Sequence, residues 1–272
     1  MTSHITAELQ QITRISPSTR IFRFLTHSSS ASFLAGQFYR FTFTDDAGSF
    51  ERSYSLCNQV EDQGKGLLDL MVSEVDKGRA TQVLFNASVG LQVSIKGPYG
   101  RLVLPQPIPA KIVLVATSVG LAPFIPMLSM MAASPSDEVR SLVLILGVRD
   151  RSEFLCEEWL LGLRKKLPCF ELLVCYSRET ASNLESYERS GYVTAAMAEQ
   201  PYDPHTDFFM LCGNPLMVDD VFALLKRLGF SGRRVRREKY VFARQEKRNL
   251  KPRSLSKNER DLLSEKIKRY GK

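Results

Sequence analysis

The sequence predicts two domains, an antiparallel β-barrel followed by an α/β domain built on a parallel sheet. Up to about residue 107, short apolar runs are separated by clusters of Gly, Ser, Asp and Asn, as in a barrel or sandwich. The segment LPQPIPA, residues 104–110, then places three prolines where they limit strand pairing. Beyond it, apolar strands alternate with helical patterns, which indicates βαβ units. We therefore expect domains at 1–107 and 108–242, followed by a basic C-terminal extension at 243–272.

In the first domain, the strand pattern is clearest in four runs that are either alternating or continuously apolar. They cover residues 20–26, 37–44, 67–75 and 91–97. A helical pattern is weaker, and it occurs at residues 79–87, RATQVLFNA. Many short strands with little helix favour a closed or sandwiched antiparallel sheet.

In the second domain, strands and helices are expected to follow one another in strict alternation. We expect strands at 111–117, 141–148, 170–177, 206–213 and 234–242, and helices at 123–133, 152–167, 192–200 and 215–229. Open parallel sheets bind ligands at the carboxyl ends of their strands, where helix N-termini and glycine turns face outward. The chemistry is therefore expected at the ends of the first four of these strands.

Composition and charge narrow the class of protein. The 272 residues are 44% hydrophobic and 24% charged, as in ordinary globular proteins. Apolar stretches are interrupted by Gly and Pro, and the N-terminus lacks a secretory pattern, so we expect a cytoplasmic protein without a membrane partner. Five cysteines without a CxxC pair argue against a disulfide framework and an iron–sulfur cluster, and we expect no metal.

The formal net charge is +8, and the surplus is concentrated from Arg233 onward. This asymmetry favours an acidic protein partner near that end of the chain. A nucleic acid is also polyanionic, and a solvated basic tail needs no partner at all, so the charge leaves these alternatives open.

The segment ERSYSLCN, residues 51–58, is the first that carries chemistry. Alternation along a strand places Arg52 and Tyr54 on one face. A guanidinium binds pyrophosphate oxygens in a bidentate manner, and a Tyr ring offers a flat stacking surface. Taken alone, the segment fits equally well an edge strand with a surface Arg and a half-buried Tyr.

Several turns in the chain are suited to phosphate. In DKGRATQVL, Gly78 permits a tight turn, and Thr81 stands in the first turn of a helix whose free amides attract phosphate. In TSVGLAP, residues 117–123, a polar turn joins a buried strand to a helix, although the GxGxxG fingerprint is absent. Each pattern also fits an ordinary turn.

Two strand ends in the second domain carry side chains of interest. In CYSRE, Ser177 and Arg178 follow a strand and suit a ribose phosphate, although a surface Arg at this place is nearly as common. In CGNPLMV, Cys212 ends a strand, where a cysteine usually acts as a small buried apolar residue.

These pieces occur in one order across residues 5–242: RSYS, GRAT, GPYG, TSVGLAP, YSRE, CGNPLMV and EKY. The ordered set resembles the ferredoxin-NADP reductase superfamily. The resemblance implies that the barrel binds FAD and that the α/β domain binds NADP.

The resemblance assigns roles in FAD binding to three segments. Arg52 contacts a flavin phosphate, Tyr54 contacts the isoalloxazine ring, and Ser55 lies at the reactive N5 edge. The full set of expected FAD contacts is Arg52, Ser53, Tyr54, Ser55, Met71, Val72, Ser73, Gly78, Ala80 and Thr81, and Tyr240 covers the opposite flavin face.

For the nicotinamide nucleotide, the resemblance implies contacts from the carboxyl ends of the strands. These are Thr117, Gly120, Arg149, Ser177 and Arg178, and the pair Ser177–Arg178 favours NADPH over NADH. Cys212 and Glu238 flank the reacting nicotinamide, so Ser55, Cys212 and Glu238 are the expected catalytic residues.

By resemblance, the chain passes electrons between NADPH and ferredoxin or flavodoxin through FAD, as a monomer without nucleic acid. The alternatives are the reductase component of a multicomponent oxygenase and an electron-transfer flavin subunit with an impaired nucleotide site. Two departures bear on this choice. Ser118 stands where the family more often has glycine, and residues 241–272 follow Tyr240, where many relatives end.

Overall fold

The computed structural model describes residues 5–26, 31–62, 64–135, 138–179, 183–197 and 200–240. The predicted extension at 243–272 lies outside these residues. The chain forms two compact units. One contains residues up to Leu104 with Leu121–Pro135, and the other contains Pro105–Gly120 with residues from 136 onward. The predicted domain boundary at residue 107 stays a prediction.

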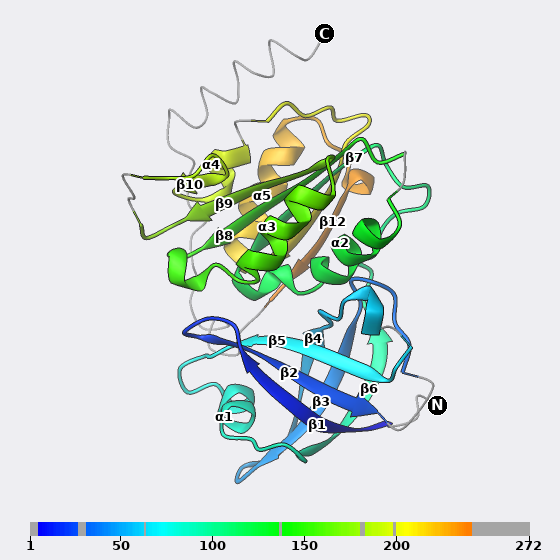
Figure 1. Cartoon of the computed structure of the whole chain (residues 1–272), viewed down its shortest axis with the longest axis vertical. Helices are drawn as coiled ribbons and strands as arrows, with labels where there is room; N and C mark the ends of the chain where they lie inside the picture. The colour runs from blue at the N-terminus through cyan, green and yellow to red at the C-terminus, as the bar shows by residue number, and fades with distance from the viewer. Residues whose placement is uncertain are drawn as a thin grey trace. The chain divides into compact units, whose positions relative to one another are not determined.

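The first unit is a six-stranded antiparallel sheet closed into a barrel (Figure 1). Its strands are β1 (Ile5–Arg14), β2 (Thr19–Thr26), β3 (Phe38–Asp45), β4 (Gly48–Ser55), β5 (Leu67–Ser73) and β6 (Gln92–Tyr99), in the order β4-β3-β6-β1-β2-β5. The two terminal strands meet through an antiparallel bridge between Leu56 and Leu70. The predicted antiparallel barrel is therefore confirmed.

Aromatic side chains fill the inside of this barrel. Alternate residues of β2 and β3 point inward, so Phe22, Phe24, Phe41 and Phe43 are all buried. The rings of Phe24 and Phe41 lie 5.4 Å apart. Each fully buried side chain of this size contributes about 1.5–3 kcal/mol through the hydrophobic effect. The helix α1 (Arg79–Phe85) lies against the same core through Ala80 and Leu84.

A charged network fixes the end of the barrel at which β4 and β5 meet. Arg23 on β2 donates to both carboxylate oxygens of Asp69 on β5, at 2.8 and 2.7 Å. Arg23 also reaches Asp62 of the short helix η1 (Val60–Asp62) at 2.6 Å. The pKa of Arg23 is raised, and the hydrogen bonds to Asp69 are the largest cause. The Val60 amide donates to Ser129 on α2 (Phe124–Ala133) at 3.0 Å.

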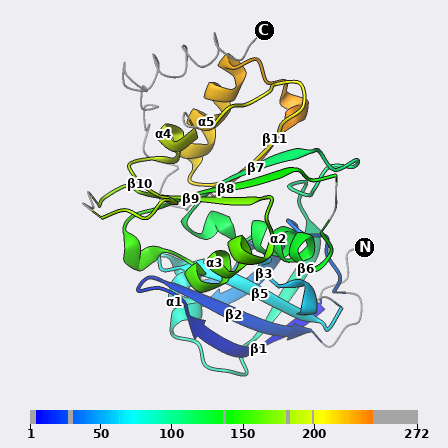
Figure 2. The same cartoon turned by 45° about the horizontal axis from the view of Figure 1, so that its top comes forward.

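The second unit is a parallel sheet with helices on both faces, as predicted (Figure 2). Its strands are β7 (Lys111–Thr117), β8 (Ser141–Val148), β9 (Phe170–Tyr176), β10 (Glu188–Ser190), β11 (Phe208–Gly213) and β12 (Val235–Lys239), in the order β10-β9-β8-β7-β11-β12. Helices α4 (Val193–Met197) and α5 (Pro215–Arg227) cover one face, and α3 (Glu157–Lys166) covers the other. The short helices η2 (Ser118–Leu121), η3 (Arg151–Glu153) and η4 (Gly232–Arg234) lie in the loops.

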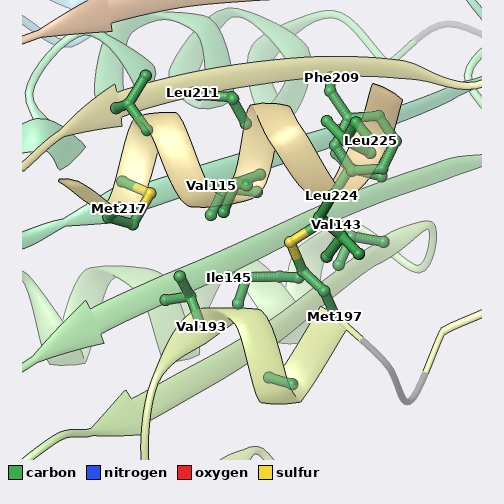
Figure 3. Close-up of a cluster of buried hydrophobic side chains, with 14 of the residues drawn as sticks. Val115, Val143, Ile145, Val193, Met197, Phe209, Leu211, Met217, Leu224 and Leu225 are labelled. Carbon is green, nitrogen blue, oxygen red and sulfur yellow. The ribbon is translucent and has the colours of Figure 1, made fainter. Parts of the chain in front are cut away.

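The face covered by α4 and α5 carries the main core of this unit, drawn in Figure 3. Val115, Val143, Ile145 and Leu211 point from the strands toward the helices. Met217, Leu224 and Leu225 of α5 and Val193 and Met197 of α4 meet them there. Central strands buried on both faces explain why the sequence shows continuous apolar runs rather than alternation.

The strand order changes direction between β7 and β11, and this change positions the ligand site. From β7, the chain adds β8, β9 and β10 on one side and then β11 and β12 on the other. Such a switch point leaves a crevice at the carboxyl ends of the two strands on either side. Thr117 and Gly213, the last residues of β7 and β11, are therefore neighbours.

No helix in the described ranges is long and apolar enough to cross a bilayer.

Candidate functional site

The two predicted flavin-binding strand segments face each other across the seam of the barrel. Beyond the bridge between Leu56 and Leu70, the antiparallel register would bring residues 53–55 opposite residues 71–73. The Asp69 carbonyl points into this seam, where it accepts from Cys57 N at 2.9 Å. Since backbone groups alternate in direction along a strand, Met71 and Ser73 turn theirs to the same side. The seam therefore offers strand backbone on one side and the RSYS segment on the other.

Arg52 and Tyr54 share one face of β4, as the sequence predicted, and Phe50 lies on the same face. The Tyr54 ring contacts Phe41 and Phe43 edge to face, at 5.9 and 6.2 Å between centroids. Burial raises the pKa of Tyr54, and the Arg52 guanidinium opposes the rise. The phenol therefore stays neutral at physiological pH and offers a held ring. Ser53 is exposed and lies on the opposite face of β4.

Two cations gather around the Phe50 ring, and only Arg52 was predicted among the site residues. The Arg52 guanidinium lies 5.3 Å from the ring centroid, and that of Arg79 lies 4.1 Å from it. Arg79 also pairs with Asp45 in the β3–β4 hairpin, with 2.7 Å from Nε to Oδ2. Phe50 therefore brings the start of α1 next to Arg52. Sequence reasoning missed Arg79 because its partners lie more than 25 residues earlier in the chain.

The turn before α1 exposes backbone amides rather than a side-chain hydroxyl. The Thr81 hydroxyl lies 2.9 Å from the Gly78 carbonyl and 3.0 Å from the Val75 carbonyl, so it closes the turn. Gly78 is the N-cap residue, and its lack of a side chain leaves the helix start without a side-chain cap. A Cβ there would come within 2.8 Å of Thr81 Oγ1. Ala80, which is buried, contributes its backbone to the same turn.

Ser55, the last residue of β4, is buried at 4% exposure. It stands at the point of the seam closest to the bridge. A hydroxyl in this place is held rigidly and shielded from water, which suits a hydrogen bond to a ring atom of a ligand lying in the seam.

In the second unit, the turns after β7 and β11 pack backbone to backbone. Thr117 Oγ1 accepts from the Asn214 amide at 2.8 Å. A Cβ on Gly213, whose φ is 127°, would overlap Thr117, and a Cβ on Gly120 would overlap the Cys212 carbonyl. Only glycine therefore fits at either position. The close approach explains why Gly120 stands in the turn, where main chain packs directly on main chain.

Ser118 adopts a backbone conformation that is typical of glycine. Its φ is +49°, in the left-handed region that residues other than Gly, Asn and Asp rarely adopt. The turn thus keeps the glycine-like shape at this position, with a hydroxymethyl group added. The predicted departure is a change of side chain rather than of backbone.

Cys212 lies at the centre of three parallel strands with no exposed surface. It is in register with Ala116 on β7 and with Glu238 on β12. Burial raises the pKa of the thiol well above its ordinary value, and the Glu238 carboxylate adds to the rise. The thiol is therefore protonated at neutral pH and is not a nucleophile.

Glu238 and Tyr240 lie beside Cys212 because β12 is the parallel neighbour of β11. The Tyr240 amide donates to the Gly213 carbonyl at 2.9 Å. The structure thus brings together Thr117, Gly120, Cys212, Glu238 and Tyr240 at the switch point of the sheet.

We expect Cys212→Ala to reduce the loss of stability at alkaline pH. The folded thiol holds its proton more tightly than the unfolded thiol, whose pKa is about 9. Above that pH the unfolded state gains stability by losing the proton, so the stabilising effect of the raised pKa disappears as pH rises. The Tm of the parent protein should fall more steeply than that of the variant between about pH 8.5 and 10.5. Thermal unfolding by circular dichroism measures this, and Cys169→Ala, at a partly exposed thiol, is the control. Parallel Tm profiles for parent and Cys212→Ala would contradict the assignment.

Arg149, Ser177 and Arg178 come together at the ends of β8 and β9. The Ser177 amide donates to the Val148 carbonyl at 3.0 Å, and the Arg178 amide donates to the Arg149 carbonyl at 2.8 Å. Both arginines are exposed. These bonds place two guanidinium-bearing residues side by side beyond neighbouring strands. A doubly charged anion is the ligand that such a pair favours.

Comparisons with known proteins match both units in order. A model described as "Oxidoreductase FAD-binding domain" matches residues 6–104, and one described as "Oxidoreductase NAD-binding domain" matches residues 114–222. A ferredoxin–NADP reductase of Azotobacter vinelandii is 26% identical over 218 residues, which cover 75% of this chain and 82% of that protein. The chain belongs to the ferredoxin-NADP reductase superfamily.

Other members of this superfamily are equally similar. The 2-halobenzoate 1,2-dioxygenase electron transfer component of Burkholderia cepacia is 28% identical over 221 residues, which cover 80% of this chain. The chain spans only 62% of the length of that protein. The crystal structure of a cytochrome P450 reductase from Amycolatopsis superimposes with a TM-score of 0.76 and 28% identity, covering 87% of this chain and 69% of that one. The chain thus contains the FAD-binding and NAD(P)-binding domains of this oxidoreductase superfamily.

The residues of the barrel fit the flavin nucleotide. A pyrophosphate is suited to a set of donors made of two guanidinium groups and the free backbone amides at a helix N-terminus. Arg52, Arg79 and the Gly78–Thr81 turn supply that set around the Phe50 ring. The seam supplies a neutral aromatic ring, Tyr54, and strand backbone for a flat ligand.

Proposed function

We propose that this chain transfers electrons between NADPH and a one-electron protein carrier, ferredoxin or flavodoxin, through FAD bound to the barrel. When bound, FAD accepts a hydride from a nicotinamide and releases the two electrons singly. The observation that supports the proposal is that one chain matches both an oxidoreductase FAD-binding domain and an oxidoreductase NAD-binding domain. We place the flavin site at the barrel seam with Arg52 and Tyr54, and the nicotinamide site at the switch point with Thr117 and Gly213.

In this proposal the barrel residues hold and shield the flavin. Arg52 and the Gly78–Thr81 turn bind its phosphates, Tyr54 packs on its ring, and Ser55 donates a hydrogen bond at its reactive edge. The main chain at 71–73, together with Ser53 and Ala80, completes the contacts. A buried, prearranged set of donors loses little free energy on reorganisation when charge moves on the ligand.

At the switch point, the α/β residues bind and orient the nicotinamide nucleotide. Thr117 and Gly120 line the pyrophosphate crevice, and the protonated Cys212 with Glu238 borders the reacting ring. Tyr240 is the residue proposed to cover the flavin and to move when nicotinamide binds. Its backbone amide donates to the Gly213 carbonyl at 2.9 Å within the second unit, so a movement of the main chain at Tyr240 would require this bond to break.

The preference for NADPH rests on Arg149, Ser177 and Arg178. A ribose 2′-phosphate carries about two negative charges at neutral pH, and two adjacent guanidiniums with a hydroxyl stabilise it by charge-assisted hydrogen bonds. NADH lacks this group, so it gains nothing from the pair. We therefore expect NADPH to be the better donor.

An acidic carrier is supported by the charge of the described surface. Seven Lys and Arg residues lie between residues 226 and 239, at the end of α5, in η4 and along β12, which is the outermost strand of its sheet: Lys226, Arg227, Arg233, Arg234, Arg236, Arg237 and Lys239. Asp219 binds Lys239 at 2.7 Å and lies 3.8 Å from Arg237, which neutralises only part of this charge. Such a surface steers an acidic protein and does so less well in salt.

The test measures electron transfer from NADPH to ferredoxin and to flavodoxin with the FAD-loaded full chain. We expect reduction of at least one carrier, with kcat/KM falling about tenfold or more as ionic strength rises from 0.05 to 0.5 M. A neutral quinone acceptor reports the effect of salt on NADPH binding alone. Reduction of the quinone without reduction of any protein carrier would overturn the assignment of a carrier. Equal salt dependence with quinone and carrier would overturn electrostatic docking.

A second candidate is the reductase component of an oxygenase, which similarity to the dioxygenase electron transfer component and the P450 reductase favours. In that case the acceptor is a separate iron–sulfur or haem protein rather than a general carrier. An oxygenase-type ferredoxin included in the same assay separates the two, because the better acceptor has the higher kcat/KM at low salt.

A further inference from the structure

A buried carboxylate lies next to the proposed 2′-phosphate residues. Glu188 opens β10 and is 2% exposed. Its Oε1 accepts from the Tyr176 hydroxyl at 2.7 Å. Its Oε2 accepts from the Arg151 guanidinium at 2.6 Å and from the Glu185 amide at 2.9 Å. A buried charge is costly unless its oxygens are bonded in this way, so the group is held tightly in one place.

The two side chains that bind Glu188 belong to the two segments that carry the phosphate residues. Tyr176 is the last residue of β9 and directly precedes Ser177 and Arg178. Arg151 follows Arg149 by two residues and begins η3. One carboxylate therefore fixes the loop after β8 and the loop after β9 at the same time.

Backbone contacts join the same two loops a second time. The Arg178 amide donates to the Arg149 carbonyl at 2.8 Å, and the Arg151 amide donates to Glu179 Oε2 at 2.9 Å. The two loops can therefore shift only together while these bonds and the Glu188 contacts remain.

The acidic residues beside the two arginines accept hydrogen bonds, Asp150 within its own loop and Glu179 from the other loop. Asp150 Oδ1 accepts from the Ser152 amide at 3.1 Å and from its hydroxyl at 2.6 Å. Glu179 accepts from the Arg151 amide. Across the described ranges, neither Arg149 nor Arg178 has a carboxylate as an ion-pair partner. Their positive charge is thus available to an anion.

We propose that Glu188, Tyr176 and Arg151 form a positioning network that holds Arg149 and Ser177–Arg178 at the spacing a ribose 2′-phosphate requires. The inference rests on the proposed function, in which these residues contact that phosphate. The network itself acts through them and sets the preference for NADPH over NADH. Bidentate hydrogen bonds to a phosphate are strong only when both donors are held in place. A displacement of a donor by about 1 Å removes much of the interaction energy.

The test measures the KM for NADPH and for NADH in flavin reduction by the FAD-loaded full chain. Tyr176→Phe removes only the buried hydroxyl, which cannot touch a ligand. Arg151→Ala removes the guanidinium that donates to Glu188 Oε2, and Arg151→Lys keeps a positive charge at this position. We expect KM for NADPH to rise about 3-fold in Tyr176→Phe and about 10-fold in Arg151→Ala, with partial recovery in Arg151→Lys. KM for NADH should stay within about twofold of the parent value, and so should kcat with NADPH.

Arg164→Ala is the matched control. Arg164 lies on α3 outside the network, and its guanidinium is 5.0 Å from the centroid of the Tyr187 ring. The substitution should leave both KM values unchanged. A joint rise of both KM values in Tyr176→Phe and Arg151→Ala would mean that the network only supports the fold, and it would overturn the inference.

Arg178→Ala separates this inference from the proposed function. Loss of NADPH preference in Arg178→Ala but not in Tyr176→Phe and Arg151→Ala would overturn the network and keep the 2′-phosphate site. A parent protein that uses NADH as well as NADPH would overturn both together.

Discussion

Replacing Arg52 with alanine is expected to weaken FAD binding by about 10- to 100-fold while the barrel stays folded. Hydrogen bonds between a guanidinium and a phosphate contribute about 1.5–3 kcal/mol each, which corresponds to this loss. Arg52 is only half-buried, and its own hydrogen bond goes to the neighbouring Glu51 carbonyl at 2.7 Å, so the fold does not depend on it. Titration of the apoprotein with FAD, followed by quenching of flavin fluorescence, gives the dissociation constants.

Arg40→Ala serves as the control for Arg52. Arg40 lies on the adjacent strand β3, is exposed, and pairs with Glu51 at 3.3 Å. Its removal should leave the FAD dissociation constant unchanged. Arg52→Lys should give an intermediate value, because an ammonium keeps the charge without the planar fork. An Arg52→Ala protein that binds FAD as tightly as the parent would show that the phosphates lie elsewhere.

Gly213→Ala should have the largest effect on the α/β unit. The φ of 127° disfavours any side chain, and the new methyl would overlap the Thr117 main chain. The two costs together amount to roughly 2–5 kcal/mol of unfolding free energy. Because Thr117 also accepts from Asn214, the crevice should distort and nicotinamide binding should be lost even where the unit stays folded.

Two other glycines of the same unit separate the causes. Gly191 also has a positive φ, +109°, but open space around it, so Gly191→Ala should cost only about 1–2 kcal/mol. Gly162 lies in α3 with open space and no positive φ, so Gly162→Ala should stabilise the unit by about 0.5–1 kcal/mol. Denaturant unfolding of the three variants measures these differences. Equal losses in Gly213→Ala and Gly191→Ala would rule out the overlap with Thr117.

Much of the fold could be predicted because buried strands leave a clear signal. The segments 111–117, 141–148, 170–177 and 206–213 each contain an unbroken apolar run, and each of these runs forms a strand of the parallel sheet. β1 was not predicted, because only Ala7 and Leu9 are buried along its ten residues and the rest reads as a polar segment. β10 is three residues long, too short for any periodicity.

The candidate site divides in the same way. Alternation alone placed Arg52 and Tyr54 on one face, and the turn pattern placed Thr117 and Gly120 at a strand end. Arg79 and Glu188 were missed, because their partners come from segments that only the tertiary fold brings near. Asp45 of the β3–β4 hairpin pairs with Arg79 of α1, and Tyr176 reaches Glu188 from a neighbouring parallel strand. No residue spacing in the sequence predicts the Asp45–Arg79 contact or the Tyr176–Glu188 contact.

Anaerobic addition of NADPH to the FAD-supplied full chain tests the central claim most directly. If the barrel seam holds FAD and the switch point of the parallel sheet holds the nicotinamide, flavin absorbance should appear in the purified protein after incubation and should bleach on addition of one equivalent of NADPH. A chain that takes up no FAD, or one whose bound FAD keeps its absorbance with both NADPH and NADH, would contradict the account.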